Sequence, residues 1–434
     1  LYGGAHSLAV VPGVENVPVV LAATDWGSLH ITNDDGVTWI EPIGLPSIDK
    51  VKRVLTSTDG EHVVYLLVRE SNSASHYVLF RSTDGMASFQ EIYDLGEGSG
   101  DIFVARDGDS YLYMVAEGDL MRSEDAGDSW SALSSLGESG LEVDLSVSEA
   151  GGPTLYAVLR DEEIVRSDDG GVSWEELGTV SDYWGTTTAS ITDPSRFAWG
   201  GVEVHYTTNS GDSFSIVNGW GDYYGDPENR LHADIPGMDV LLNEKGEEIW
   251  YVSTDGGLYK SEDMLESVEN LSLQGLRISQ YYGTHTSRVN PMNVAAGAQD
   301  QGYQLSTEWD GMSGLVQFDQ VLSGDYAHLV SGDGSHDWVF SVYPGFVLVQ
   351  YNEDNPSMTY LDFPAEELGL YYAWLPPLVP DTEETRNFFL CATHLYRYMW
   401  NGSSWDIEQW SDQNFQSEPY EYISGALFSK TDPN

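Results

Sequence analysis

The chain carries the octet SEDAGDSW at residues 123–130, and the octet SDDGGVSW at residues 167–174 follows the same pattern. A third copy, TNDDGVTW, occupies residues 32–39, and the shared pattern is Ser/Thr-x-Asp-x-Gly-x-Ser/Thr-Trp. Three less regular copies occupy residues 82–89, 207–214 and 261–268. The last positions of the six octets lie 40 to 54 residues apart. This period matches the size of one four-stranded blade of a β-propeller.

Each octet has the composition of a tight hairpin turn. The Asp125 carboxylate and the Ser123 hydroxyl can accept or share backbone hydrogen bonds within such a turn. Gly127 supplies a positive φ where a side chain would clash, and Trp130 is expected to turn inward and pack between adjacent sheets. We therefore predict that the acidic residues of the octets hold turns and take no part in catalysis.

Two strand-like runs precede each octet, as at residues 155–159 and 164–166. The order strand, turn, strand, octet hairpin, strand describes one blade. No apolar stretch with helical spacing is longer than a turn or two, so the chain is expected to be all-β. We predict a propeller of four-stranded antiparallel blades over residues 1–434, with about nine to ten blade-like units.

The octets divide the chain into a regular part, residues 1–270, and a divergent part, residues 271–434, which is a candidate for a second propeller. Further blades are expected around residues 293–321, 338–363 and 388–410, and residues 218–239 are expected to form an insertion. The last residues, 423–434, parallel residues 6–12 at the other end. Either these two ends complete a shared blade and close one large ring, or the chain is part of a tandem propeller.

The charge of the chain excludes two classes of partner. Asp and Glu total 70 against 18 Lys and Arg, for a net charge of −52. Such a surface repels nucleic acid and anionic lipid head groups. Adaptation to high salt, a calcium-loaded surface and the solubility of an exported protein all remain open as explanations.

The cysteine content and hydropathy add three expectations about processing and location. Cys391 is the only cysteine, so no intrachain disulfide forms. No run of about 18 apolar residues is present, so we expect no membrane insertion. The chain begins at Leu1 without a signal-peptide pattern, which is typical of a processed or trimmed product. We predict a secreted or cell-surface protein.

The octets resemble those of Asp-box propellers, the bacterial neuraminidase repeat proteins. That superfamily includes sialidases, xyloglucan-cleaving tandem propellers, sortilin-type receptors and photosystem assembly factors. Residues 220–340 are similar in order to large secreted bacterial propellers labelled glycosyl hydrolase or sortilin-like, on the segments LHAD (231–234), GAQDQG (297–302) and SGD (323–325). The chain has Gly237 where such proteins often carry a second histidine, which puts in doubt a metal or catalytic role carried over to His232 and Asp234.

A sialidase needs three arginines that clamp a carboxylate. Arg277 and Arg288 are available, but no third arginine is evident, and the Arg-Ile-Pro motif of that family is absent. The sequence therefore argues against a sialidase.

A glycosidase with two catalytic carboxylates is better supported. The xyloglucan-cleaving family places acids in a Thr-Asp-x-Gly context, and Asp25 and Asp255 are the matching positions. Asp300 and Asp325 join them from later units as candidate catalytic acids. Hydrolysis needs two carboxyl groups about 5 to 10 Å apart across the sugar. The alternative is that these Asp-Gly pairs only make turns.

A metal site has weaker support. His232, His285, His328 and His336 match no zinc motif. Asp333, between two glycines, is a candidate calcium ligand because calcium prefers oxygen donors. No cofactor is required by any motif in the chain.

A binding function needs the fewest special assumptions. Exposed-looking aromatic residues flanked by Asp and Asn suit the CH faces and hydroxyls of a carbohydrate, and also protein hot spots; packing between blades is the alternative. Aromatic residues of this kind cluster at residues 220–224 and 281–282, and in YYAW at residues 371–374. The candidate ligand-binding residues are Trp220, Tyr223, Tyr224, His232, Asp234, Tyr281, Tyr282, Gln299, Gln301 and His328.

We predict a propeller that binds a polysaccharide or protein ligand at one ring face. A glycan-cleaving enzyme is the first alternative, and a structural segment of a larger surface assembly is the second.

Overall fold

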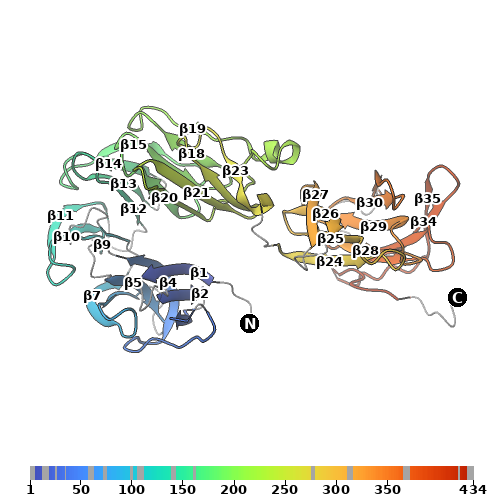
Figure 1. Ribbon diagram of the computed structural model, residues 1–434, viewed down its shortest axis with the longest axis horizontal. Helices are drawn as coiled ribbons and strands as arrows, with labels where there is room; N and C mark the ends of the chain where they lie inside the picture. Colours follow the sequence, from blue (N-terminus) through green and yellow to red (C-terminus); the bar gives the residue numbers. More distant parts are fainter. Residues whose placement is uncertain are drawn as a thin grey trace. The chain divides into compact units, whose positions relative to one another are not determined.

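The computed structural model describes residues 5–11, 19–24, 27–34, 36–56, 63–71, 76–97, 101–104, 112–137, 143–159, 163–274, 279–309, 316–364, 372–418 and 421–427. These residues form nine antiparallel sheets, of which eight have four strands and one has three (Figure 1). The chain is therefore an all-β protein with the four-stranded blades of a multi-blade β-propeller, as the sequence predicts. Within the described residues, the structure contains no helix of the length and apolarity that crossing a bilayer requires.

The chain divides into two compact units. Unit 1 comprises Leu1–Asn218, Asp234–Ser253 and Lys260–Ser267, and unit 2 comprises Gly219–Ala233, Thr254–Tyr259 and Val268–Asn434. Whether the divergent residues 271–434 belong to a second propeller remains a prediction.

Five sheets lie wholly in unit 1, and each follows the order of the chain from one edge to the other. Their strands are β1 (Ala5–Val11), β2 (Val19–Thr24) and β3 (Leu29–Thr32); β4 (Ile48–Thr56), β5 (Val64–Glu70), β6 (His76–Ser82) and β7 (Gln90–Glu97); β8 (Ile102–Val104), β9 (Leu112–Ala116), β10 (Asp119–Ser123) and β11 (Ser131–Ser135); β12 (Val143–Ser148), β13 (Thr154–Leu159), β14 (Glu163–Ser167) and β15 (Glu175–Thr179); β16 (Thr186–Ala189), β17 (Phe197–Gly200), β18 (Val204–Thr207) and β19 (Ser215–Ile216).

Three sheets lie wholly in unit 2, and one sheet has residues in both units. The latter consists of β20 (Gly237–Leu242), β21 (Glu248–Thr254), β22 (Gly257–Ser261) and β23 (Glu269–Asn270). The sheets of unit 2 are β24 (Tyr281–Thr286), β25 (Val294–Ala298), β26 (Gly302–Trp309) and β27 (Val316–Leu322); β28 (Ala327–Val330), β29 (Trp338–Tyr343), β30 (Phe346–Tyr351) and β31 (Ser357–Asp362); β32 (Leu378–Pro380), β33 (Phe388–Cys391), β34 (Leu395–Trp400) and β35 (Trp405–Gln409). The short 3-10 helices η2 (Trp220–Gly225) and η3 (Leu271–Gln274) also belong to unit 2.

The first strands of successive sheets lie next to one another. In unit 1 this row contains β4, β8, β12, β16 and β20, and in unit 2 it contains β24, β28 and β32. Apolar side chains fill the space between neighbouring sheets, as where Tyr113 and Leu120 of one sheet pack with Leu145 and Leu155 of the next. These strands are covered on both faces, and Val, Leu and Tyr side chains suit such strands.

The six octets form one kind of hydrogen-bonded turn. In residues 167–174, the Ser167 hydroxyl donates to the Asp169 carboxylate at 2.8 Å, and the Gly171 N–H donates back to the Ser167 hydroxyl at 2.8 Å. The Asp169 carboxylate also accepts from the N–H and the hydroxyl of Ser173, at 2.8 and 2.6 Å. Four of the other octets repeat these contacts. In the fifth, Asn209 takes the place of the aspartate, and its Nδ2 donates to the Ser213 hydroxyl while the other contacts are kept. The prediction that the octet acids hold turns is confirmed.

The last residue of the octet packs against the sheets in five of the six copies. Phe89 and Val268 are buried, and Trp130, Trp174 and Phe214 contact core clusters. Trp39 differs, because 46% of its surface is exposed and its indole N–H donates to the Gly36 carbonyl of its own turn. The expectation of an inward-packed aromatic is therefore wrong for the first octet.

Two octets lack the glycine at their fifth position but keep its backbone conformation. Met86 and Leu265 take this place with φ of 70° and 66°, in the left-handed region that favours glycine. Both side chains are fully buried. Burial of the apolar side chain therefore offsets the strain that these residues accept.

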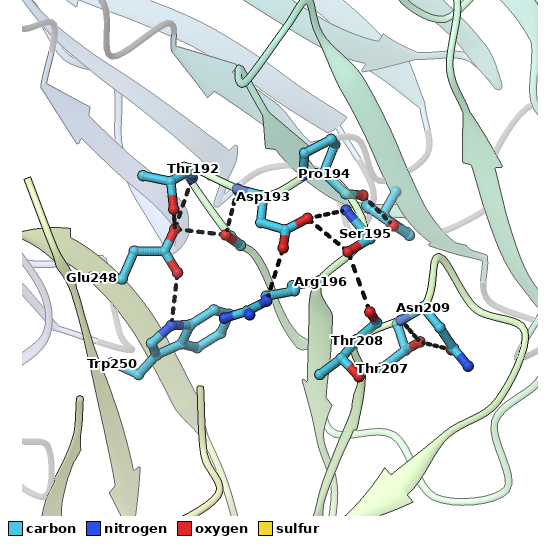
Figure 2. A network of polar contacts seen from close by, with 12 residues as sticks. Thr192, Asp193, Pro194, Ser195, Arg196, Thr207, Thr208, Asn209, Glu248 and Trp250 are labelled. Atoms are coloured by element: carbon cyan, nitrogen blue, oxygen red, sulfur yellow. Dashed lines mark hydrogen bonds and ion pairs between the residues drawn. The ribbon is translucent and has the colours of Figure 1, made fainter. Parts of the chain in front are cut away.

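Glu248, in unit 1, ties the sheet of β16–β19 to the sheet of β20–β23. Figure 2 shows its carboxylate between Thr192 and Trp250. Its Oε1 accepts hydrogen bonds from the Ser190 hydroxyl at 2.6 Å and from the Thr192 N–H at 2.8 Å, and its Oε2 accepts from the Trp250 indole at 3.1 Å. The loop after β16 is thereby fixed to the start of β21.

The ends and the insertion match the sequence predictions in part. The described residues 421–427 contain no strand, although the Ile423 N–H donates to the Ala392 carbonyl; the expected opening strand is therefore absent there, and residues 428–434 lie outside the described part. The insertion at residues 218–239 is mostly helix η2 and loop, but β20 already begins at Gly237.

Candidate functional site

Three of the four predicted catalytic carboxylates gather around one histidine of unit 2. His232 Nε2 lies 3.8 Å from Asp300 Oδ1, and the Asp300 N–H donates to Asp325 Oδ1 at 3.3 Å. The charge of His232 also acts on Asp255 and on Asp325. We call Asp255, Asp300, Asp325 and His232 the carboxylate cluster. Asp25, the fourth predicted acid, lies outside the described residues.

Strand ends place the three acids. Asp255 lies in the turn between β21 and β22, Asp300 in the turn between β25 and β26, and Asp325 in the connection from β27 to β28. Asp300 has a φ of 57°, a conformation that aspartate tolerates better than most residues. Its carbonyl accepts from the Gly324 N–H at 3.2 Å, so these two connections are fastened to each other.

His232 is buried and held from three sides. Its Nδ1 donates to the Ala233 carbonyl at 2.9 Å, which turns Nε2 toward Asp300. The Tyr223 ring packs edge-on against the imidazole at 4.7 Å. Gly256 covers another side so closely that a Cβ there would lie 2.5 Å from His232 Cβ. The glycine after Asp255 is therefore required by the histidine.

Two of the clustered acids keep their protons more strongly than an ordinary aspartate. Burial raises the pKa of Asp255, and the charge of His232 offsets only part of the effect. Burial also raises the pKa of Asp325; the Asp300 N–H and His232 lower it, and the charge of Asp255 raises it further. A site that holds carboxyl groups with raised pKa values can donate a proton as well as bind hydroxyl groups.

Tyr223 contacts two members of the cluster, His232 and Asp300. It is fully buried on η2, and its hydroxyl accepts from Gln320 Nε2 at 2.9 Å and lies 3.5 Å from the Asp300 carbonyl. Gln320 donates also to the Ser323 hydroxyl at 3.1 Å. The sequence does not mark Gln320 as a site residue, because a single amide on β27 carries no pattern. Ser323 belongs to the segment SGD (323–325) but is not among the candidate binding residues.

Exposed aromatic rings accompany the cluster. Burial raises the pKa of Tyr282 to about 12, and the charges of Asp325 and Asp300 contribute. The pKa of Tyr224 is raised to about 12 by burial, by Tyr343 and by the same two carboxylates. Both phenols therefore lie within electrostatic range of the carboxylates.

Two tryptophans extend this aromatic surface. Trp220 is 54% exposed and meets Tyr224 edge-on at 6.0 Å, and Trp374 is 55% exposed and meets Tyr282 edge-on at 6.2 Å. We call Trp220, Tyr224, Tyr282 and Trp374 the aromatic rim. Within the 371–374 segment, Tyr372 instead packs on Phe363, and Tyr371 lies outside the described residues.

Three predicted ligand-binding residues serve the framework around the cluster. Gln301 is buried, and its amide oxygen accepts from the Ser279 hydroxyl. Gln299 donates its N–H to the Gln280 carbonyl, and the Tyr281 hydroxyl donates to Gln304 at 2.8 Å. These contacts hold the turn that carries Asp300.

Two other predicted residues make hydrogen bonds with residues outside the cluster. Asp234 belongs to unit 1, where its N–H donates to the Val202 carbonyl. His328 donates from Nε2 to the Leu375 carbonyl at 3.1 Å.

The predicted calcium ligand, Asp333, accepts hydrogen bonds within its own loop. Asp333 Oδ1 accepts from the hydroxyl and N–H of Ser335, both at 2.8 Å, and from the Ser331 hydroxyl at 3.1 Å. Nearby, His285 and His336 each donate from Nε2 to a backbone carbonyl. Among the residues that the structure describes, no three His, Cys, Asp or Glu side chains gather to hold a metal ion. Calcium binding remains a prediction.

Solved structures with the same fold include glycoside hydrolases. A GH74 enzyme from Niastella koreensis matches with a TM-score of 0.58 at 12% identity, over 95% of this chain and 66% of that enzyme. The GH74 xyloglucanase from Xanthomonas campestris matches with a TM-score of 0.58 at 12% identity, over 93% of this chain and 66% of that enzyme.

The chain thus spans just under two thirds of the length of these two enzymes. At this identity the likeness shows a common β-propeller fold. No protein-family model matches the chain, and no curated protein matches it either.

Proposed function

We propose that unit 2 binds a glycan, with the carboxylate cluster and the aromatic rim as the binding surface. The observation that carries this proposal is that exposed Tyr224 and Tyr282 lie within electrostatic range of Asp300 and Asp325. Aromatic rings pack on the CH faces of sugars, and carboxylates accept hydrogen bonds from sugar hydroxyls. A surface that combines both groups suits a carbohydrate better than a charged partner. The proposal includes a place outside the cell, which the acidic composition supports.

A glycan panel tests the binding. Xyloglucan is the first ligand to try, because a xyloglucanase shares the fold, and other neutral plant and bacterial polysaccharides complete the panel. Calorimetric titration should show binding of at least one glycan, and Trp220→Ala and Tyr282→Ala should each weaken it by about tenfold, since a lost stacking ring is worth about 1 kcal/mol or more. Trp410→Ala is the matched control, because Trp410 is exposed but packs on Phe389 and Arg397. Equal losses in all three variants, or no binding by the panel, would reject the proposal.

Glycoside cleavage is a second candidate function, and the raised pKa values of Asp255 and Asp325 favour it. A glycosidase needs one protonated carboxyl group that donates to the leaving oxygen and one charged carboxylate that acts as base or nucleophile. Because the charge of Asp255 raises the pKa of Asp325, the pair holds one proton more readily than two isolated acids. In this role Asp325 is the acid and Asp255 the carboxylate partner.

The release of new reducing ends separates the two functions. An active wild type should lose about 100-fold or more of its rate in Asp255→Asn and in Asp325→Asn, in line with the contribution of general acid–base groups. The exposed Asp354→Asn serves as the control. Binding without any release of reducing ends would uphold the first function and remove the second.

A further inference from the structure

Unit 1 contains a cavity of about 1470 Å³ that is separate from the residues of the carboxylate cluster. Strands β4, β8, β12, β16 and β20, the row of first strands, supply most of its wall. Small-molecule sites usually have volumes of about 300 to 1,000 Å³. This cavity therefore has room for a ligand of several sugar rings or several amino acids.

One strand brings three cations to this cavity in a chain that has only 18. Lys50, Lys52 and Arg53 of β4 all line it. Two of them are neutralised by buried acids: Arg53 pairs with both oxygens of Asp101 at 2.8 and 3.0 Å, and Lys52 lies 3.2 Å from Asp144. These two ion pairs leave little capacity for a ligand charge.

The buried acids are satisfied as well. Asp101 accepts further hydrogen bonds from the N–H groups of Ile102 and Leu145, at 2.9 and 2.8 Å, and Asp144 accepts from the Tyr183 hydroxyl at 2.6 Å. Although burial works against a charged lysine, Asp144 and Asp101 hold the pKa of Lys52 above its ordinary value. This network is closed, and it acts as a fixed wall of the cavity.

Lys50 is different from the other two cations. Its ammonium group makes no ion pair or hydrogen bond with any residue that the structure describes, although it lines the same cavity. A partly buried cation with no carboxylate partner is a ready site for an anionic group. It stands on a chain with a net charge of −52, in which a free cation inside a cavity is unusual.

The rest of the wall carries two further acids, Glu149 and Asp239, each engaged in an interaction of its own, together with hydroxyl groups and a ring face. The Thr187 side chain on β16 is 93% buried, since its exposed fraction is 7%, and its Oγ1 has no hydrogen-bond partner among the described residues. Such an unsatisfied hydroxyl costs stability unless a ligand or water pairs with it. Trp184, which also lines the cavity, is 48% exposed and offers a flat ring.

We propose that the cavity of unit 1 binds a short acidic saccharide. Lys50 pairs with the carboxylate of a uronic acid, Thr187 exchanges a hydrogen bond with a sugar hydroxyl, and Trp184 packs on a ring face. A saccharide suits this wall because it combines a carboxylate, hydroxyl groups and ring faces in one ligand. The hydroxyls of Ser146, Thr186 and Thr188 are already hydrogen-bonded to backbone groups, so Thr187 carries the contact to a sugar hydroxyl.

Titration of the full chain with trigalacturonate, against neutral maltotriose, tests this site. We expect trigalacturonate to bind and maltotriose to bind at least about tenfold more weakly, since a charge-assisted hydrogen bond contributes about 1.5 to 3 kcal/mol. Lys50→Gln should weaken the binding of trigalacturonate by about tenfold or more and leave the binding of maltotriose unchanged. Thr187→Val should weaken the binding of both sugars severalfold. Lys245→Gln, at a lysine whose side chain is 80% exposed, should change neither.

Several results would overturn the proposal. These are no binding of trigalacturonate at millimolar concentration, equal affinity in the wild type and Lys50→Gln, equal affinity for the neutral sugar, or preference for a peptide ending in a free carboxylate. Asp325→Asn separates this site from the one in unit 2, because trigalacturonate binding in the cavity should survive it. Loss of binding in Asp325→Asn would place the saccharide in unit 2 and reject the cavity, whatever the outcome of the glycan panel.

Discussion

The Asp300 N–H donates a hydrogen bond to the Asp325 carboxylate at 3.3 Å, yet the pKa of Asp325 is still raised. The hydrogen bond stabilises the charged form, as does His232. Burial and the charge of Asp255 outweigh both. The fold therefore keeps a carboxylate at an energetic disadvantage, which is a common property of residues retained for function.

Asp325→Asn should make the protein more stable at neutral pH. A carboxyl group whose folded pKa is raised stabilises the fold while it is protonated, and this contribution is lost as the pH rises through the folded pKa. The amide keeps an acceptor for the Asp300 N–H but carries no charge. We expect a higher Tm than wild type at pH 7, and a difference that vanishes near about pH 3, below the ordinary pKa of aspartate.

Thermal melts at both pH values check this prediction, with Asp354→Asn as the exposed control. A variant that is less stable than wild type at pH 7 would show that the Asp325 charge serves the fold.

Asp101→Asn should be strongly destabilising because it removes the carboxylate that holds Arg53 at 2.8 Å and leaves the guanidinium only the more distant Asp144, at 3.9 Å. Asp101 is fully buried and accepts both Arg53 hydrogen bonds. Breaking a buried pair by removing one partner costs about 3 to 5 kcal/mol. Asp49→Asn is the matched control, since the Asp49–Arg69 pair lies near the surface, with an Asp49 side chain that is 42% exposed, and such pairs contribute at most about 1 kcal/mol. Urea unfolding measures the free energy of unfolding of both variants. Similar losses of stability in Asp101→Asn and Asp49→Asn would contradict the prediction.

Asp169→Asn should remove part of the acid sensitivity of the fourth octet. Hydrogen bonds from the Ser173 hydroxyl, the Ser173 N–H and the Ser167 hydroxyl lower the pKa of Asp169 to about 2. A lowered carboxyl pKa stabilises the fold above the unfolded value, near 3.8, and the effect is lost as the pH falls toward 2. Asparagine already makes this turn at Asn209, where the amide oxygen accepts from the Ser213 N–H at 3.1 Å.

Hydrogen exchange of a peptide covering residues 163–179 follows the turn directly. In wild type, protection should fall between pH 4 and pH 2 after correction for the intrinsic exchange rate, whereas Asp169→Asn should show a smaller change. Identical profiles for the two proteins would mean that the Asp169 charge has no part in the turn.

Leu265→Gly should be less destabilising than Leu265→Ala, which reverses the usual order of these two substitutions. Both remove a fully buried side chain, a loss of about 2 to 5 kcal/mol for alanine. Only glycine also releases the strain at φ of 66°, which is worth about 1 kcal/mol. Equilibrium unfolding of both variants tests the order. Gly211→Ala, at the equivalent position, should be destabilising, because its φ is 94° and a Cβ would lie 2.5 Å from Leu177.

The sequence predicts those features that depend on neighbours along the chain. The octet turns close within four residues, so their acids could be assigned to structure from the pattern alone. The fate of Trp39 depends on how the next sheet covers it, and the pattern does not contain that information. Asp300 and Asp325 could be grouped because both lie in strand connections of neighbouring sheets.

Other parts of the two sites depend on pairs that are distant in sequence. Gln320 reaches Tyr223 across 97 residues, and Arg53 reaches Asp101 across 48. The run Lys50 to Arg53 has the composition of a solvated edge strand, and only the assembled row of first strands shows that it lines a cavity. The contacts of such residues are decided by packing between segments that are distant in the sequence.

The self-contained turns of the octets also have a consequence for how the chain folds. Each turn is closed by hydrogen bonds between residues at most four apart, so it needs no contact with another sheet. Hairpins of this kind form in about 1 to 10 μs, well before distant strands meet. The octets therefore set strand register early and locally, and the slow step left to the chain is the docking of preformed hairpins into successive sheets.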